Sequence, residues 1–428
     1  MMADTDSRPQ EKAILVGLER EGVSRWDVED SLSELRQLAA TAGAQVVDTV
    51  VQKLEKPTAP FYIGKGKAEE VARRCGEKHV TSLIFDDELS PAQGRNLEQL
   101  TSRKVLDRTQ LILDIFARRA RTREGRLQIE LAQLQYLLPR LTRMWTHLSR
   151  QTGGIGTRGP GETQLEVDRR RVQERIARLE RDLLGVRKNR TVQREGRLRR
   201  NWPVASLVGY TNAGKSSLLN SLTGAGVPAE NRLFATLDPT TRQLVLPNKQ
   251  KVLLTDTVGF IRKLPHTVIE SFKATLEEVQ LADLLIHIVD ISHPQYREQM
   301  AAVDETVAEL GANGKQTVIV FNKIDRLTDR EILNSQLRHH PGSAAISAKT
   351  GEGMDSFFQE LEVRLGSWRM RAEFRIPNTE SALLAEIHRV GHVLNLSYEA
   401  DTAIVIAHVP PELKSRLVPY EKDAGLRA

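Results

Sequence analysis

The stretch "GYTNAGKS", residues 209–216, decides the fold of the centre of the chain, because it fits the pattern G-x-x-x-x-G-K-[ST]. The apolar run "VASLVG" that leads into it is typical of a buried strand, and the residues after it are typical of a helix. In such a loop, glycines let backbone N–H groups turn toward phosphate oxygens, and the helix start adds a positive dipole end. The stretch predicts a phosphate-binding loop, with Lys215 on the β- and γ-phosphates and Ser216 on Mg²⁺.

Two further stretches predict the rest of a phosphate and magnesium site. "KVLLTD" ends at Asp256, whose carboxylate can bind Mg²⁺ through water. Gly259, three residues later, can offer its backbone N–H to the γ-phosphate. Thr236 in "FATLD" lies on the loop between the first helix and the next strand, where a second magnesium-binding hydroxyl is expected.

The motif "NKID", residues 322–325, predicts that the base is guanine. Asp325 can accept two hydrogen bonds from the guanine N–H groups, and adenine lacks that pair of donors. Asn322 is expected to brace the loop, and the stem of Lys323 is expected to cover the base. "SAK", residues 347–349, follows the last strand and is placed to close over the base. These motifs together indicate a guanine-nucleotide site.

The candidate residues of the nucleotide site form five runs along the chain, residues 209–216, 234–238, 256–259, 322–325 and 347–349. The nucleotide-binding candidates are Gly209, Tyr210, Thr211, Asn212, Ala213, Gly214, Lys215, Ser216, Phe234, Ala235, Thr236, Leu237, Asp238, Asp256, Thr257, Val258, Gly259, Asn322, Lys323, Ile324, Asp325, Ser347, Ala348 and Lys349. The catalytic candidates are Lys215, Asn212, Gly259 and Thr236. The magnesium ligands are Ser216 and Thr236, with Asp256 acting through water.

Phe260 stands where a GTP-hydrolysing chain usually has a glutamine that aims the attacking water. Because a phenylalanine can neither donate nor accept that hydrogen bond, we expect slow intrinsic hydrolysis. The side-chain carbonyl of Asn212 can hold a potassium ion against the phosphates, where developing charge needs neutralising. An arginine supplied by a partner is the alternative source of acceleration.

The order of strand-like and helix-like runs predicts an α/β multidomain chain. We expect an N-terminal parallel α/β domain over residues 1–120 and a helical hairpin with a glycine-rich tip over 121–200. A P-loop GTPase domain is expected over 201–367 and a small α+β module over 368–428. The hairpin is predicted from two apolar seams whose spacings suit long helices, with Pro139 inside the first.

The charge distribution points to a polyanionic partner. Residues 103–200 hold 25 Lys/Arg against 11 Asp/Glu, a net of +14, whereas the whole chain carries +6. Such density over nearly one hundred residues favours nucleic acid over a merely solvated face or an anionic membrane surface. The tip "GGIGTRGPG" is slim enough to enter a narrow RNA cavity, although a flexible linker is the other interpretation. The RNA-binding candidates are Gly154, Arg158, Gly159, Arg169, Arg170 and Arg171.

Composition sets the remaining expectations. No apolar run approaches the length of a membrane span, and the polar start does not resemble a signal peptide. Cys75 is the only cysteine, which excludes an internal disulfide and fits a reducing cytosol. We expect a cytoplasmic monomer.

The stretches "GYTNAGKSS", "LFATLDPTTR", "DTVGFIRKLP" and "NKID" resemble the GTPase domain of the HflX family, in the Obg–HflX group of P-loop GTPases. "RGPGETQLE" and "LILDIFARRARTREGRLQIELAQL" resemble that family's N-terminal part. The resemblance covers about residues 13–365. It implies a protein that binds the large ribosomal subunit and its rRNA in the GTP form, splits stalled ribosomes under heat stress, and leaves on hydrolysis. The family also carries a hydrophobic residue at the position of Phe260.

Two other functions stay open at this point. One is a signalling switch that acts on proteins and not on ribosomes, which needs little affinity for RNA. The other is an ATP-driven RNA remodeller working from the N-terminal domain, where "YIGKGK", residues 62–67, opens a helix and could bind a second nucleotide or an RNA phosphate. A plain turn before a helix explains the same residues.

Overall fold

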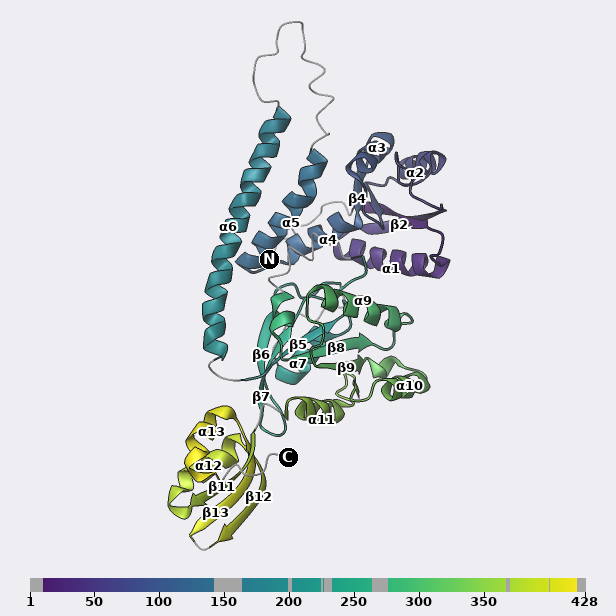
Figure 1. The fold of residues 1–428 in the computed structure, drawn as a ribbon. Coiled ribbons are helices and arrows are strands. Elements are labelled where there is room, and N and C mark those ends of the chain that lie inside the picture. The colour runs from purple at the N-terminus through teal and green to yellow at the C-terminus, as the bar shows by residue number, and fades with distance from the viewer. Residues whose placement is uncertain are drawn as a thin grey trace, which may run out of the picture. The chain divides into compact units, whose positions relative to one another are not determined.

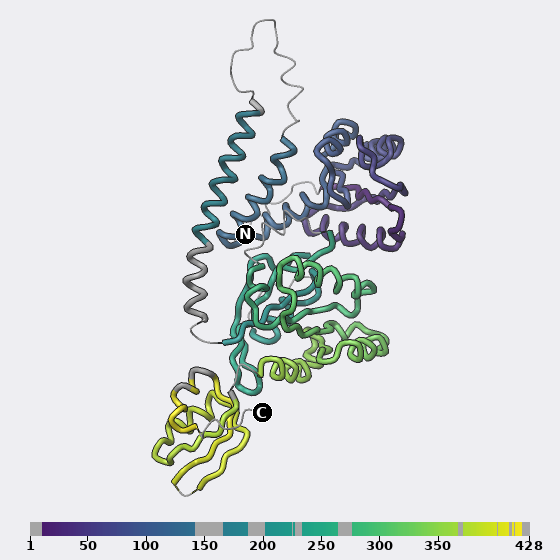
Figure 2. The backbone as a smooth tube through the Cα atoms, in the orientation of Figure 1, coloured from purple at the N-terminus to yellow at the C-terminus, as the bar shows by residue number. Residues whose placement is uncertain are grey.

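The structure is a computed structural model that describes residues 11–141, 164–198, 202–224, 226, 233–263, 276–366, 370–399 and 401–421. The chain divides into two compact units. The first holds the described residues up to Val186 together with Leu233, Phe234 and Lys263, and the second holds the rest. Figures 1 and 2 show the elements of each unit coloured along the chain.

The first unit begins with a four-stranded parallel sheet in the order β2-β1-β3-β4. Its apolar core lies between the sheet and its helices, and the strand–helix alternation confirms the predicted parallel α/β fold. Strand β4 was not predicted, because its sequence "KVLD" has only two apolar residues, between charged ones, and shows no strand pattern. The elements are β1 (Lys12–Glu19), α1 (Arg25–Thr41), β2 (Gln45–Lys53), α2 (Lys65–Glu77), β3 (Ser82–Phe85), α3 (Pro91–Thr101), β4 (Lys104–Asp107) and α4 (Arg108–Arg119).

Local sequence signals explain where α3 begins. The Ser90 hydroxyl accepts a hydrogen bond from the backbone N–H of Gln93, and the Gln93 side chain accepts one from the N–H of Ser90. This reciprocal cap satisfies N–H groups that have no partner inside a helix, and Pro91 at the helix start has no N–H that needs one. A serine followed by a proline predicts a helix start at this place, and the structure confirms it.

A buried charge cluster lies at the carboxyl ends of β3 and β4. The Arg108 guanidinium is 2.9 Å from Glu34 and 3.0 Å from Asp86, and its side chain is almost fully buried. Lys263, which belongs to this unit although it comes from far along the chain, lies 2.5 Å from Asp86 and 2.7 Å from Asp87. The cluster joins segments that are distant in sequence around one set of carboxylates.

Two long helices, α5 (Arg123–Leu141) and the part of α6 (Gln164–Leu198) up to Val186, form the arm of the first unit. Leu131, Leu179 and Leu183 pack into one apolar cluster between them, as the predicted seams require. Arg175 pairs with Glu130 across the two helices at 2.7 Å. Pro139 lies inside α5, near the end of its described part.

The second unit contains a six-stranded sheet in the order β10-β9-β8-β5-β7-β6. All strands are parallel except β6, which pairs antiparallel with β7 at the edge. The apolar runs "VASLVG", "KVLLTD", "LLIHIVD", "TVIVFN" and "SAAIS" predict five strands, and the structure has them as β5, β7, β8, β9 and β10. The strand β6 was missed because "TTRQLV" is largely polar and half exposed. The elements are β5 (Val204–Gly209), α7 (Lys215–Thr223), β6 (Thr240–Val245), β7 (Lys251–Asp256), β8 (Leu284–Asp290), α9 (Tyr296–Glu309), β9 (Thr317–Asn322), a 3-10 turn (Ile324–Arg326), α10 (Glu331–His339), β10 (Ala344–Ala345) and α11 (Met354–Arg364).

The end of the chain forms an antiparallel sheet in the order β11-β13-β12. Alternate residues of β13 are buried, so one face of the sheet packs on the helices around Phe374 and Ile387. The elements are β11 (Met370–Pro377), α12 (Ser381–Val390), β12 (His392–Glu399), β13 (Thr402–Val409) and α13 (Pro411–Leu417). Within the described ranges, every helix is too short or too polar to cross a membrane.

Candidate nucleotide-binding site

The predicted phosphate loop connects the end of β5 to the start of α7. Gly209 has φ of +151°, and a Cβ there would lie 2.3 Å from the carbonyl oxygen of Ile288. Gly214 has φ of +102°, and a Cβ there would lie 2.2 Å from the Asn322 amide nitrogen. Both positions therefore require glycine, for backbone conformation and for space. The geometry of the loop therefore requires these two glycines of the motif.

The turn after β7 lies directly against this loop. The N–H of Phe260 donates to the carbonyl of Gly209 at 3.1 Å, and the N–H of Thr211 donates to the carbonyl of Phe260 at 2.7 Å. A Cβ on Gly259 would lie 2.7 Å from the Cα of Thr211. Phe260 is fully buried. The ring that replaces the usual glutamine is thus a packing group, and its backbone holds the turn to the phosphate loop.

Two hydroxyls and a carboxylate meet at the start of α7. The Ser216 hydroxyl lies 2.7 Å from the Thr236 hydroxyl and donates to Asp256 Oδ2 at 2.7 Å. The other carboxylate oxygen of Asp256 is buried and has no hydrogen-bond partner among the described residues. Oxygen donors of this kind suit Mg²⁺, and a cation would satisfy the remaining carboxylate oxygen. The three predicted magnesium residues therefore fit the metal.

Burial shifts the protonation of the two charged groups of this site. It raises the pKa of Asp256, against the opposing effect of nearby Lys215. It lowers the pKa of Lys215 to about 8, although the charge of Asp256 opposes the change. The Lys215 ammonium donates to the carbonyls of Gly209 and Tyr210 at 3.0 and 2.8 Å. Both shifts arise because burial makes the charged form of each group costly. A bound anion beside Lys215 and a bound cation beside Asp256 would offset that cost, so the electrostatic contribution to binding would be favourable in each case.

The predicted base-binding residues meet at the ends of β9 and β10. Asn322 donates to the carbonyl of Ala213 at 2.8 Å and accepts from the N–H of Ala348 at 3.0 Å, so it braces both loops as predicted. Ser347 donates to Asp325 at 2.7 Å and fixes one of its carboxylate oxygens. Asp325 itself is exposed. The carboxylate is thus oriented yet accessible to a base.

Lys323 has a partner that the sequence did not indicate. Its ammonium lies 2.6 Å from Asp290 at the end of β8 and donates to the carbonyl of Asn212 at 2.8 Å. These contacts lay the lysine stem across the phosphate loop. Asp290 ends an apolar strand, as Asp256 does, and that position was the available signal.

The other candidates are placed as follows. Phe234 belongs to the first unit, where its buried ring packs edge-on against Phe116 with centroids 4.6 Å apart. The Thr257 hydroxyl donates to the carbonyl of Leu207, inside the core. Arg169, Arg170 and Arg171 are exposed on α6. Gly154, Arg158 and Gly159 lie outside the described residues.

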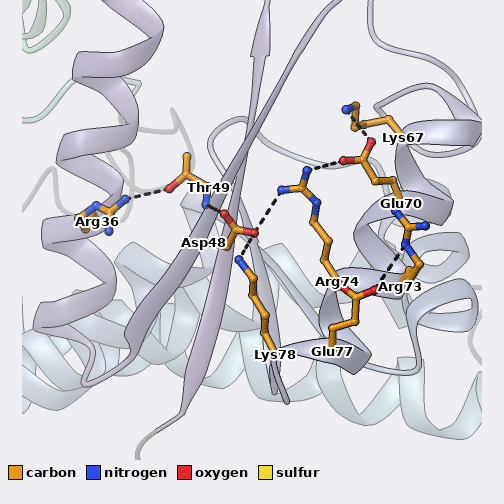
Figure 3. A network of polar contacts seen from close by, with 9 residues as sticks. All are labelled: Arg36, Asp48, Thr49, Lys67, Glu70, Arg73, Arg74, Glu77 and Lys78. Carbon is orange, nitrogen blue, oxygen red and sulfur yellow. Dashed lines mark hydrogen bonds and ion pairs between the residues drawn. The ribbon is translucent and has the colours of Figure 1, made fainter.

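The helix start at residues 62–67 is held by side chains of α2 and of the neighbouring strand β2. The Gly64 N–H donates to Gln52 at 2.9 Å. Lys67 donates to Glu70 at 2.7 Å, and Glu70 also accepts from Arg74, whose guanidinium reaches Asp48, as Figure 3 shows. Because carboxylates within the domain neutralise these cations, the geometry favours the plain turn over a second phosphate site.

Comparison with known proteins identifies the family. Profiles described as "GTP-binding GTPase N-terminal", "GTP-binding GTPase Middle Region" and "50S ribosome-binding GTPase" match residues 29–117, 119–197 and 204–323. The GTPase HflX of Lacrimispora saccharolytica is 50% identical, over 95% of this chain and 96% of that protein. The GTPase HflX of Caldanaerobacter subterraneus subsp. tengcongensis is 46% identical, over 96% and 94%. A solved GTP-binding protein from the archaeon Sulfolobus solfataricus, in complex with GDP, is 24% identical, covers 83% of this chain and 99% of that one, and has a TM-score of 0.44. The identity of nearly full-length relatives confirms the resemblance seen in the motifs: this chain belongs to the HflX family of GTPases.

Proposed function

We propose that this GTPase binds the large ribosomal subunit in its GTP form, splits or rescues stalled ribosomes under stress, and leaves when GTP is hydrolysed. The observation that carries the proposal is the arm formed by α5 and α6, with leucines inside and arginines outside. The side chains of Arg170 and Arg171 are 57% and 70% exposed. The matched profile for residues 204–323 is described as a ribosome-binding GTPase, which supports the same partner.

The arginines of the arm can exchange their present partners for phosphates. Arg170 lies 3.7 Å from Glu174, and Arg171 lies 3.7 Å from Asp168. Exposed pairs of this kind contribute only about 0–1 kcal/mol. A charged hydrogen bond to a phosphate is stronger, and each one also releases a counterion from the RNA. The arm therefore supplies salt-dependent affinity for rRNA.

The proposed roles in the nucleotide site follow the described contacts. Lys215 and the N–H groups of residues 209–216 bind the phosphates, and Asp325 with Ser347 and Lys349 selects guanine. Ser216 and Thr236 hold Mg²⁺, with Asp256 acting through water. When bound, the metal supplies positive charge to the β- and γ-phosphate oxygens.

We also propose that Asn212 binds a potassium ion through its side-chain carbonyl. Asn212 is exposed in the phosphate loop with φ of +62°. A monovalent cation there would supply charge where the usual glutamine is missing. Single-turnover hydrolysis in KCl and in NaCl, with wild type and Asn212→Ala, tests this. Potassium should accelerate only the wild type, and equal rates in all four reactions would remove the proposal.

The ribosomal role is tested by sedimentation with purified ribosomal subunits. Wild type with a non-hydrolysable GTP analogue should pellet with the large subunit, and wild type with GDP should stay in the supernatant. A triple variant, Arg169→Glu with Arg170→Glu and Arg171→Glu, should bind more weakly, and its salt slope should fall by about 2–3. The matched control is Arg25→Glu, an 81% exposed arginine on α1.

Three outcomes bear on the proposal. Loss of binding in the triple variant alone supports a role of the arm. Equal binding of the two nucleotide forms would show that nucleotide does not control docking. No binding with either nucleotide would leave a GTPase without a ribosomal partner.

We propose four domains, over residues 1–120, 121–200, 201–367 and 368–428. Separate apolar clusters in the first sheet, the arm, the GTPase sheet and the last sheet support this division. The proposed function places the chain in the cytoplasm, as a monomer that joins ribosomes. Analytical ultracentrifugation of the chain alone would test the monomer.

A further inference from the structure

Tyr210 contacts two separate parts of the GTPase site, Lys215 and the chain that follows the D-x-x-G turn. Its carbonyl accepts a hydrogen bond from the Lys215 ammonium at 2.8 Å. Its hydroxyl accepts a hydrogen bond from the backbone N–H of Arg262 at 2.9 Å. The side chain is buried. One residue of the phosphate loop therefore fixes both the phosphate-binding lysine and the chain that follows the D-x-x-G turn.

The segment held by Tyr210 is fixed at both ends. Tyr210 and Phe260 form a parallel β-bridge, through the two backbone hydrogen bonds that Phe260 makes with Gly209 and Thr211. Two residues later, the Tyr210 hydroxyl holds the backbone of Arg262. The guanidinium of Arg262 in turn donates to the buried Gln295 at 2.7 Å. Gly259 directly precedes this held segment.

We propose that Tyr210 is a positioning residue for GTP hydrolysis, which sets the backbone of the D-x-x-G turn by anchoring the chain after Phe260. In a site with a glutamine, a side chain orients the water. Here Phe260 cannot do so, and the placement of the Gly259 N–H rests on the backbone contacts of residues 260–262. The hydroxyl of Tyr210 is a side-chain group of the phosphate loop that contacts that segment directly. This inference rests on GTP hydrolysis and is independent of ribosome binding.

The effect should be confined to the hydrolysis step. GDP has no γ-phosphate for the turn to contact, so the anchor should matter little for GDP binding. Tyr210→Phe removes only the hydroxyl and leaves the N–H of Arg262 without its acceptor. We expect the single-turnover rate constant to fall about tenfold, which corresponds to about 1.4 kcal/mol of barrier. The Kd for GDP should stay within about twofold.

The experiment compares wild type, Tyr210→Phe and Tyr398→Phe, without ribosomes. Tyr398 is an exposed tyrosine of β12, so its variant controls for loss of a hydroxyl as such. Three quantities are measured: the hydrolysis rate constant with excess protein, the Kd for GDP, and hydrogen exchange of the peptide that contains Arg262. We expect slower hydrolysis and faster exchange in Tyr210→Phe alone, with unchanged GDP affinity.

Two results would overturn the proposal. Hydrolysis by Tyr210→Phe at the wild-type rate or faster would show that the anchor does not serve the reaction. A loss of GDP affinity as large as the loss of rate would show that the hydroxyl supports the whole loop and does not position the turn. Neither result depends on whether the chain binds ribosomes, so the two proposals fail separately.

Discussion

His287 is a buried histidine in the middle of the GTPase sheet, and it makes the stability of that sheet sensitive to acid. It lies on β8, opposite Val208 of β5 and Ile319 of β9, and it is 3% exposed. Burial lowers its pKa from 6.5 to about 4, and the positive charges of Lys215 and His340 act in the same direction. The imidazole is therefore neutral in the folded protein at neutral pH.

The sign and size of the effect follow from this shift. Below about pH 6.5 the unfolded chain binds a proton at His287, whereas the folded chain does not until about pH 4. The unfolded state thus binds more protons in this window, and stability is lost as the pH falls from 6.5 toward 4. At about 1.36 kcal/mol per pH unit, the full loss is about 3 kcal/mol. At neutral pH the residue adds no such dependence.

The test variant is His287→Leu, because a leucine side chain cannot titrate and has a volume similar to that of histidine. Hydrogen exchange of peptides from β5, β8 and β9, corrected for the intrinsic rate at each pH, reports the opening free energy of this sheet. Between about pH 7 and about pH 4, the opening free energy of the sheet should fall by about 3 kcal/mol more in wild type than in the variant. His339→Gln, at an exposed position on α10, should behave as wild type. Equal acid losses in wild type and His287→Leu would refute the reasoning.

Three further predictions concern other parts of the fold. Gly353 and Gly351 both have positive φ, but only at Gly353 would a Cβ meet backbone, 1.9 Å from a carbonyl oxygen of β10. Gly351→Ala should therefore cost about 1–2 kcal/mol of left-handed strain and Gly353→Ala clearly more, as thermal unfolding will show. Arg108→Leu should lower the urea stability of the first unit by about 3–5 kcal/mol, because the buried carboxylates of Glu34 and Asp86 each lose one ion-pair partner. Arg25→Ala, in an exposed pair, should cost under about 1 kcal/mol. The pKa of Lys215 is about 8 and a bound phosphate would raise it, so GDP affinity should fall as the pH rises above about 8. Calorimetry in buffers of different ionisation enthalpy should show that protons are taken up when GDP binds. If no protons are taken up, the proposed contact between Lys215 and phosphate is contradicted.

The strand-end positions of the GTPase motifs could be predicted because parallel strands present their carboxyl ends at one edge. Gly209, Asp256 and Asn322 each end an apolar run, and the structure places them at the ends of β5, β7 and β9. The edge strand β6 could not be predicted in this way. It is half exposed and polar, so its pairing with β7 depends on tertiary context and not on a hydrophobic period.

Contacts between side chains that are far apart in the sequence also could not be predicted. Nothing in the motif "GYTNAGKS" indicates that the Tyr210 hydroxyl accepts from Arg262, 52 residues later. The ring of Phe234 packs on Phe116 in the first unit, a contact that its place in a nucleotide motif does not indicate. Motif spacing encodes backbone geometry near a ligand, but it carries no information about which distant side chain fills a pocket.

The replacement of glutamine by Phe260 changes which forces hold the catalytic turn. A glutamine side chain at this position would stay near solvent to reach a water, and its backbone would need other support. Burial of the Phe260 ring contributes about 1.5–3 kcal/mol and ties the turn to the core. Its N–H and C=O then pair with Gly209 and Thr211, so the turn and the phosphate loop move as one body. Such a site gains a fixed backbone but lacks a mobile group for the water. Charge neutralisation by a cation or a partner is therefore the kind of assistance that would raise its rate, because it requires no movement of the turn.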